Sequence, residues 1–103
     1  MVKKIQQNEF EELVLNNKGI VLVDFYADWC GPCKMLGPVL EQLSEEKQEV
    51  TICKVNIDEN EALAQEYQVQ AIPNLIFFKD GKKITRKMGF QKKQDLLQIL
   101  ETL

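Results

Sequence analysis

The chain contains no histidine and only three cysteines, Cys30, Cys33 and Cys53. Three cysteines are too few for a disulfide-stapled secreted scaffold, and their number is odd. A structural zinc site usually takes four Cys or His ligands from two clustered pairs, whereas here a single close pair stands alone. We therefore expect no metal site. A metal cluster bridged between two subunits is the one metal alternative that the spacing leaves open.

The chain also lacks long apolar runs and an excess of positive charge. No stretch approaches the roughly 18 apolar residues of a membrane span, and the N-terminal "MVKKIQQNEF" lacks the apolar core of a secretory signal. The net charge of −3 offers no electrostatic footprint for nucleic acid or an anionic membrane. We expect a soluble, cytoplasmic monomer with neither a nucleic-acid nor a membrane partner. Its 103 residues fit one domain, 1–103.

The hydrophobic pattern that remains predicts an α/β fold. The apolar, β-rich stretches 20–26 and 50–57 flank a helical stretch, which together predict a βαβ unit. "LIFFK" and "KITRKM" flank Asp80-Gly81, a pair suited to a type I′ hairpin, and residues 92–103 predict an amphipathic helix. The sheet should therefore be mixed, with parallel strands early and antiparallel strands late.

Two capping patterns predict where the shorter helices begin. Asn8 with Glu11 three residues later predicts the start of a helix that carries Phe10 inward. Asp58 with Glu61 predicts the start of a second short helix that runs through Tyr67.

The two close cysteines lie in "DWCGPCK", residues 28–34, at the start of the long predicted helix. Pro32 is favoured at the first helical position, which places Cys30 just ahead of the helix and Cys33 in its first turn. Unpaired N–H groups and the positive end of the helix dipole then favour a Cys30 thiolate, the nucleophilic form. The three-residue offset brings the two Cβ atoms close enough for a disulfide. We expect a redox pair in which Cys30 is exposed and attacks, and Cys33 lies deeper and resolves.

The segment "VDFYADWCGPCK", residues 23–34, resembles the active-site segment of the thioredoxin family, and the likeness extends over the whole chain. The resemblance implies the thioredoxin fold, a central mixed β-sheet flanked by four helices. It also implies a general protein dithiol–disulfide reductase that holds no cofactor of its own. Its partners would be protein disulfide substrates and a flavin-dependent thioredoxin reductase, fed by NADPH, that restores the dithiol.

Asp24 interrupts an otherwise apolar strand, so we expect its side chain to be buried. Desolvation raises the pKa of a buried carboxyl toward the range of a general acid or base. A satisfied structural carboxylate is the alternative. The resemblance implies that Asp24 takes the proton of Cys33. Lys54 is then either its charged partner, which the family pattern favours, or an exposed side chain at a sheet edge.

"AIPNL", residues 71–75, places Pro73 just ahead of a strand, where a bend and a cis bond are both open from the residues alone. The resemblance implies a cis Ile72–Pro73 bond that faces the cysteines, with the backbone of Ile72 free to pair with an extended substrate. The residues that match the family's substrate surface are Trp29, Gly31, Pro32, Ile57, Ala71, Ile72, Pro73, Met88, Gly89 and Phe90.

Four positions depart from the family's usual residues. Asn74 replaces a Thr, Tyr26 a Trp, Gly37 an Ala, and Phe90 a small residue. The bulky Phe90 bears on how broad the substrate range is. Cys53 lies in a buried strand and is expected to act as a small apolar side chain.

Two other functions compete with the reductase. The first is a disulfide isomerase or oxidant, against which the Gly31-Pro32 pair between the cysteines argues, because it matches the reductants. The second is a pure binding module, which would tolerate the loss of Cys30, Cys33, Asp24 or Pro73. All four residues are present.

Overall fold

Five strands form one sheet in the order β1-β3-β2-β4-β5 in the computed structural model, which describes residues 1–103. β1 pairs with β3 and β3 with β2 in parallel, while β2–β4 and β4–β5 are antiparallel. The mixed sheet and its change from parallel to antiparallel are as predicted. The strands are β1 (Val2–Lys4), β2 (Ile20–Tyr26), β3 (Thr51–Asn56), β4 (Asn74–Lys79) and β5 (Lys82–Met88).

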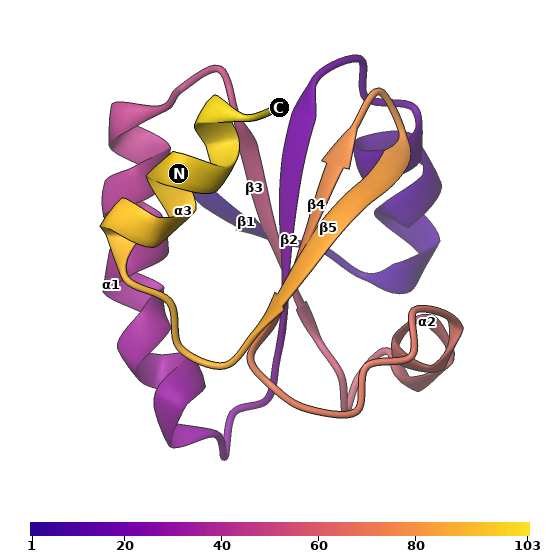
Figure 1. Cartoon of the computed structure of the whole chain (residues 1–103). Helices are drawn as coiled ribbons and strands as arrows, with labels where there is room; N and C mark the ends of the chain where they lie inside the picture. Colours follow the sequence, from indigo (N-terminus) through magenta and orange to yellow (C-terminus); the bar gives the residue numbers. More distant parts are fainter.

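Four helical segments cover the sheet, two on each face (Figure 1). α1 (Gly31–Glu46) and α3 (Lys93–Glu101) lie on one face. On the other face lie α2 (Glu61–Glu66) and an N-terminal segment in which a 3₁₀ turn, η1 (Gln7–Glu9), continues through Phe10 into a π-helical turn, η2 (Glu11–Leu15). The predicted number of flanking helices is confirmed. None of the helices combines the length and the apolar character that a membrane span requires.

β2 joins the two halves of the core. Its residues 21–25 are all buried, and alternate side chains face opposite layers. Val21, Val23 and Phe25 pack in one cluster with Phe10 and other side chains of the η and α2 face. Leu22 packs in a second cluster with Leu36, Leu40 and Leu43 of α1 and with Leu96 of α3. A strand covered on both faces explains why its sequence reads as a nearly continuous apolar run.

The βαβ unit and the hairpin are both confirmed. β2, α1 and β3 follow one another with β2 and β3 parallel. In the hairpin, Asp80 and Gly81 have φ angles of 51° and 80°, the positive values that a type I′ turn requires. Gly81 has a second reason to lack a side chain, since a Cβ there would collide with the carbonyl oxygen of Leu15.

The short N-terminal elements differ from the prediction. β1 was not predicted, because three residues at a sheet edge leave almost no periodic pattern. The first helical segment begins at Gln7, where the Glu9 carboxylate accepts a hydrogen bond from the Gln6 N–H at 2.9 Å. The predicted cap at Asn8 is therefore wrong.

α2 also begins later than predicted, with Asn60 rather than Asp58 at its N-cap. The reason is tertiary. The Asp58 carboxylate accepts a hydrogen bond from the Trp29 indole N–H at 2.8 Å instead of capping a helix.

Candidate active site

Cys30 and Cys33 form a disulfide at the start of α1, with their Cα atoms 5.2 Å apart. Cys30 is the N-cap residue, and Pro32 lies in the first turn. The first backbone N–H groups of a helix have no intrahelical acceptor. One of them, that of Cys33, donates to the Cys30 Sγ at 3.2 Å. The helix start therefore places an N–H donor at the Cys30 sulfur, which is the arrangement that the predicted Cys30 thiolate requires.

The expectation that Cys30 is exposed and Cys33 lies deeper is wrong. The two side chains are almost equally buried, with exposed fractions of 5% and 6%. In the disulfide form both belong to a small cluster with Ala27, against which Ile57 and Ile72 pack. Exposure does not distinguish the two thiols. Their surroundings do, because Cys33 alone of the pair lines a cavity that contains Asp24.

Asp24 is buried on β2, with an exposed fraction of 3%. Its Oδ1 has no hydrogen-bond partner, and the carboxyl lines a cavity of about 130 Å³ beneath α1. Burial raises the pKa of Asp24 from 3.8 to about 7, although the charge of Lys54 opposes the shift. The lining residues of this cavity are Val2, Asp24, Tyr26, Cys33, Gly37, Leu40, Glu41 and Lys54.

Lys54 lies on β3 in register with Asp24. The two ion pairs of the structure are Lys4–Glu59 and Lys93–Glu46, so Lys54 does not form one with Asp24. Instead its Nζ lies over the Tyr26 ring, 5.2 Å from the ring centroid, in a cation–π contact. Lys54 is therefore neither fully exposed nor an ion-pair partner. It acts on Asp24 at longer range, by lowering the pKa of its carboxyl.

The segment that precedes β4 faces the cysteines. The Ile72–Pro73 peptide bond is cis, as the resemblance implied, and Ile72 packs against the cysteine cluster. The Pro73 carbonyl oxygen accepts a hydrogen bond from the Gly89 N–H at 2.7 Å. The Asn74 side-chain amide donates to the Ala71 carbonyl oxygen at 3.0 Å, while its own Oδ1 has no partner.

The residues that match the family's substrate surface gather at one end of the sheet. Strand register places Phe25 of β2 and Met88 of β5 opposite Asn74, the first residue of β4. The last residues of β2 and β3 pair with each other, and the start of α1 lies at the same end of the sheet (Figure 1). Trp29 is 69% exposed and Phe90 is 39% exposed, and Met88 is exposed as well. Gly31, Pro32 and Ala71 are exposed, Ile57, Ile72 and Gly89 are half-buried, and Pro73 is buried.

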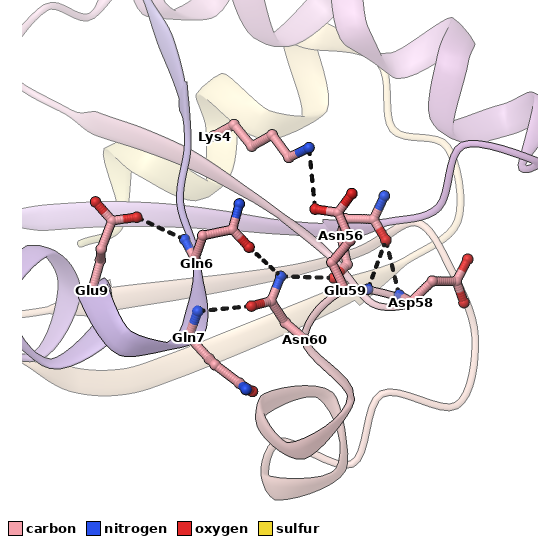
Figure 2. A network of polar contacts seen from close by, with 8 residues as sticks. All are labelled: Lys4, Gln6, Gln7, Glu9, Asn56, Asp58, Glu59 and Asn60. Atoms are coloured by element: carbon pink, nitrogen blue, oxygen red, sulfur yellow. Dashed lines mark hydrogen bonds and ion pairs between the residues drawn. The ribbon is translucent and has the colours of Figure 1, made fainter.

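A polar network that the sequence did not reveal holds the loop that carries Asp58 (Figure 2). The Asn56 Oδ1 accepts hydrogen bonds from the N–H groups of Asp58 at 2.8 Å and Glu59 at 3.2 Å. The Asn60 amide donates to the Asn56 carbonyl oxygen at 3.0 Å. The Asp58 carboxylate accepts a hydrogen bond from the indole N–H of Trp29, the residue that precedes Cys30. The network therefore fixes the hydrogen-bond acceptor of Trp29. Asparagine is common in loops, so no local sequence pattern identifies Asn56 and Asn60 as members of this network.

No group of three or more Cys, Asp or Glu side chains gathers closely enough to hold a metal ion.

Comparison with known proteins gives one consistent result. The thioredoxin family model matches residues 1–102. A thioredoxin of Chlamydia pneumoniae is 48% identical over 100 residues, which cover 97% of this chain and 96% of that protein. A thioredoxin of Mycoplasmoides gallisepticum is 43% identical over 93 residues, covering 90% and 92% of the two chains. A thioredoxin of Staphylococcus aureus is 43% identical over 101 residues, covering 97% and 95%.

Proposed function

Because the chain belongs to the thioredoxin family and is a protein dithiol–disulfide oxidoreductase, we propose that it serves as a general reductant of protein disulfides in the cytoplasm. Its mixed sheet with four helical segments is the thioredoxin fold. The observation that carries the proposal is the Cys30–Cys33 disulfide at the start of α1, with a buried acid in the cavity that Cys33 lines.

Two thiol exchange steps perform the reduction. The Cys30 thiolate attacks one sulfur of a substrate disulfide, which forms a mixed disulfide and releases the other substrate sulfur as a thiolate that takes a proton from water. The Cys33 thiolate then attacks the Cys30 sulfur and releases the second substrate sulfur. Two electrons have passed to the substrate, and Cys30 and Cys33 end as the disulfide that the structure contains.

Asp24 takes the proton that Cys33 loses before the second step. The support for this role is that Asp24 and Cys33 line one cavity and that burial raises the pKa of Asp24 to about 7. A group that titrates near neutral pH both accepts and returns a proton readily under cellular conditions. Lys54 limits the shift, because its charge favours the carboxylate.

The substrate binds as an extended segment beside Ile72, whose backbone supplies strand-like hydrogen bonds. The exposed side chains of Trp29, Met88 and Phe90 supply apolar contacts on either side of the cysteines. Gly89 has a φ of 86°, a left-handed conformation that favours glycine, and it leaves room for the substrate backbone. The other contacts of this surface come from Gly31, Pro32, Ile57, Ala71 and Pro73.

Turnover needs an external two-electron donor, because each reduction leaves the Cys30–Cys33 disulfide behind. Within the family framework that donor is a flavin-dependent thioredoxin reductase, which draws its electrons from NADPH. The protein would then carry electrons to the disulfides of cytoplasmic proteins and keep their cysteines in the thiol form.

Insulin reduction tests this function. With dithiothreitol, or with thioredoxin reductase and NADPH, the protein should reduce the insulin interchain disulfides at a rate well above the reagent background. An isomerase would instead reactivate scrambled ribonuclease more effectively than it reduces insulin. A binding module would do neither.

The roles of the two cysteines are tested by trapping. Cys33→Ser should accumulate mixed disulfides with target proteins, because the resolving thiol is missing, whereas Cys30→Ser should accumulate none. Cys53→Ala is the matched control, since Cys53 is a free but buried thiol, and it should trap nothing. Mass spectrometry of the adducts decides. Equal trapping by the first two variants would contradict the assignment.

A further inference from the structure

Arg86 of β5 donates two hydrogen bonds to the end of a helix on the same face of the sheet. Its position lies in register with Ile76, whose side chain belongs to the core cluster on the α2 face. The guanidinium binds the Gln68 carbonyl oxygen through Nη1 at 3.1 Å and the Tyr67 carbonyl oxygen through Nη2. A planar guanidinium suits this two-point contact, because its donors point in fixed directions.

The two carbonyl groups belong to the C-terminal cap of α2. The Val69 N–H donates to the Ala64 carbonyl oxygen at 2.9 Å, the long hydrogen bond of a Schellman cap. Gln68 has a φ of 54°, a left-handed conformation in which glycine is the usual residue. The last carbonyl groups of a helix have no intrahelical donor. Arg86 therefore supplies both donors and a positive charge at an end that lacks a glycine.

The chain then runs directly into the segment that faces the cysteines. Residues 69–73, here called the presenting segment, connect this cap to β4 and include Ile72, which packs against the cysteine cluster. At its far end the Pro73 carbonyl oxygen is held by the Gly89 N–H. β5 and the residue that follows it thus hold the chain on either side: Arg86 binds Gln68 just ahead of the presenting segment, and Gly89 binds Pro73 at its end.

We propose that Arg86 is a positioning residue for protein substrates, because its guanidinium fixes the near end of the presenting segment and so the placement of the Ile72 backbone beside the cysteines. The inference rests on the proposed function, in which a protein substrate pairs with that backbone. Arg86 does not contact the cysteines. A small disulfide needs only access to the Cys30 sulfur, so Arg86 should matter for protein disulfides and not for small ones.

The test compares Arg86→Gln and Arg86→Lys with the parent and with Lys87→Gln. Lys87 is the next residue of β5 but is in register with Leu75 of the opposite face, and it lines the groove against α3, so it is the matched control. Insulin reduction is measured over a range of insulin concentrations. In parallel, each prereduced protein is reacted with hydroxyethyl disulfide. Amide hydrogen exchange reports on residues 69–72.

Arg86→Gln should raise the KM for insulin about five- to ten-fold, since charge-assisted hydrogen bonds of this kind are lost. Its rate with hydroxyethyl disulfide should stay within about two-fold of the parent, because the thiol chemistry is unchanged. Arg86→Lys keeps the positive charge but not the planar pair of donors, so its KM for insulin should lie between those of the parent and Arg86→Gln. Exchange should accelerate in residues 69–72 of both variants. Lys87→Gln should behave as the parent in every assay.

Parallel losses with insulin and with the small disulfide would overturn the proposal and leave Arg86 as a tether for stability alone. Unchanged KM values in Arg86→Lys and Arg86→Gln would overturn it as well. If Arg86→Gln fails to fold, Arg86→Lys and its exchange rates decide. Failure of the proposed function looks different, because then the parent itself does not reduce insulin.

Discussion

Asp24 is the only charged side chain among the buried residues of this protein. Its Oδ1 lacks a hydrogen-bond partner, and Lys54 is turned toward the Tyr26 ring and forms no ion pair with it. A buried carboxylate without such partners destabilises the folded state whenever it is charged. We expect this destabilisation to accompany the proton-transfer role proposed for Asp24.

The pKa of Asp24 sets the pH range in which this destabilisation is seen. The folded pKa is about 7 against 3.8 for the unfolded chain, so the folded state binds more protons between these values. The stabilising contribution that comes from protonation of Asp24 in the folded state is fully present below pH 3.8, and it is lost as the pH rises through about 7. Asp24→Asn should therefore be more stable than the parent at pH 8, by about 4 kcal/mol at most. Urea midpoints measured from acid to alkaline pH check this.

The gain should vanish below pH 3.8, where Asp24 becomes neutral in both states. Asp28→Asn is the control, because Asp28 is exposed, and its midpoints should follow the parent within about 0.5 kcal/mol. Insulin reduction should fall in Asp24→Asn, since an amide cannot take the Cys33 proton. An Asp24→Asn protein that is less stable than the parent at pH 8, or fully active, would show that Asp24 is an ordinary structural carboxylate.

Helix α1, which begins directly after Cys30 and contains Cys33, also contains an internal glycine. Gly37 lines both the cavity that contains Asp24 and an adjoining groove of about 480 Å³. A Cβ at Gly37 would meet no atom within 4 Å. The absence of a side chain therefore leaves an opening beside Asp24 at the cost of some helix stability.

Gly37→Ala should stabilise the protein by about 0.5 to 1 kcal/mol, because alanine has the higher helix propensity and the site has room for its methyl group. Gly89→Ala is the matched contrast. Its site is equally open, but its φ of 86° disfavours any side chain, so it should be destabilised by a similar amount or more. Thermal unfolding of both variants measures the two signs. A loss of stability in Gly37→Ala would refute this account of α1.

The larger elements were predicted from the sequence, and the smaller ones were not. Apolar runs and the Asp80-Gly81 turn act through neighbours within a few residues, and β2, α1, β3 and the hairpin all followed them. The predicted caps failed at Asn8 and Asp58. Capping residues have several possible acceptors or donors, and here Trp29 decided where the Asp58 carboxylate points.

Asn60 ties distant parts of the molecule together (Figure 2). Its side chain is 1% exposed and binds three groups. Its Oδ1 accepts from the Gln7 N–H at 2.8 Å, and its Nδ2 donates to the Gln6 Oε1 at 3.1 Å and to the Asn56 carbonyl oxygen at 3.0 Å. One amide thus joins the N-terminal segment to the loop that carries Asp58.

Asn60→Ala should lower the free energy of unfolding by about 2 to 3 kcal/mol, because buried groups lose their partners. The fluorescence of Trp29, the only tryptophan, should change as well, since the loop that holds its acceptor is released. Asn8→Ala is the control, because Asn8 is exposed and caps no helix, and it should leave both quantities unchanged. Equal losses in the two variants, measured by urea unfolding, would argue against the network.

The sequence by itself determined the class of fold, the redox pair at the start of a helix and the burial of Asp24. Each of these depends on local periodicity, on a turn or on the polarity of one residue within an apolar strand, and such causes act over short distances. The cis bond before Pro73 came only from the resemblance to the family.

Only the tertiary structure decided the placement of β1 beside β3, the equal burial of Cys30 and Cys33, and the contact of Lys54 with the Tyr26 ring. It also decided that Arg86 binds a carbonyl group 19 residues away and Asn60 an N–H group 53 residues away. A side chain of this length can reach many polar groups. Which one it meets is set by how the helices pack on the sheet, because that packing brings together segments with no local relation in the sequence.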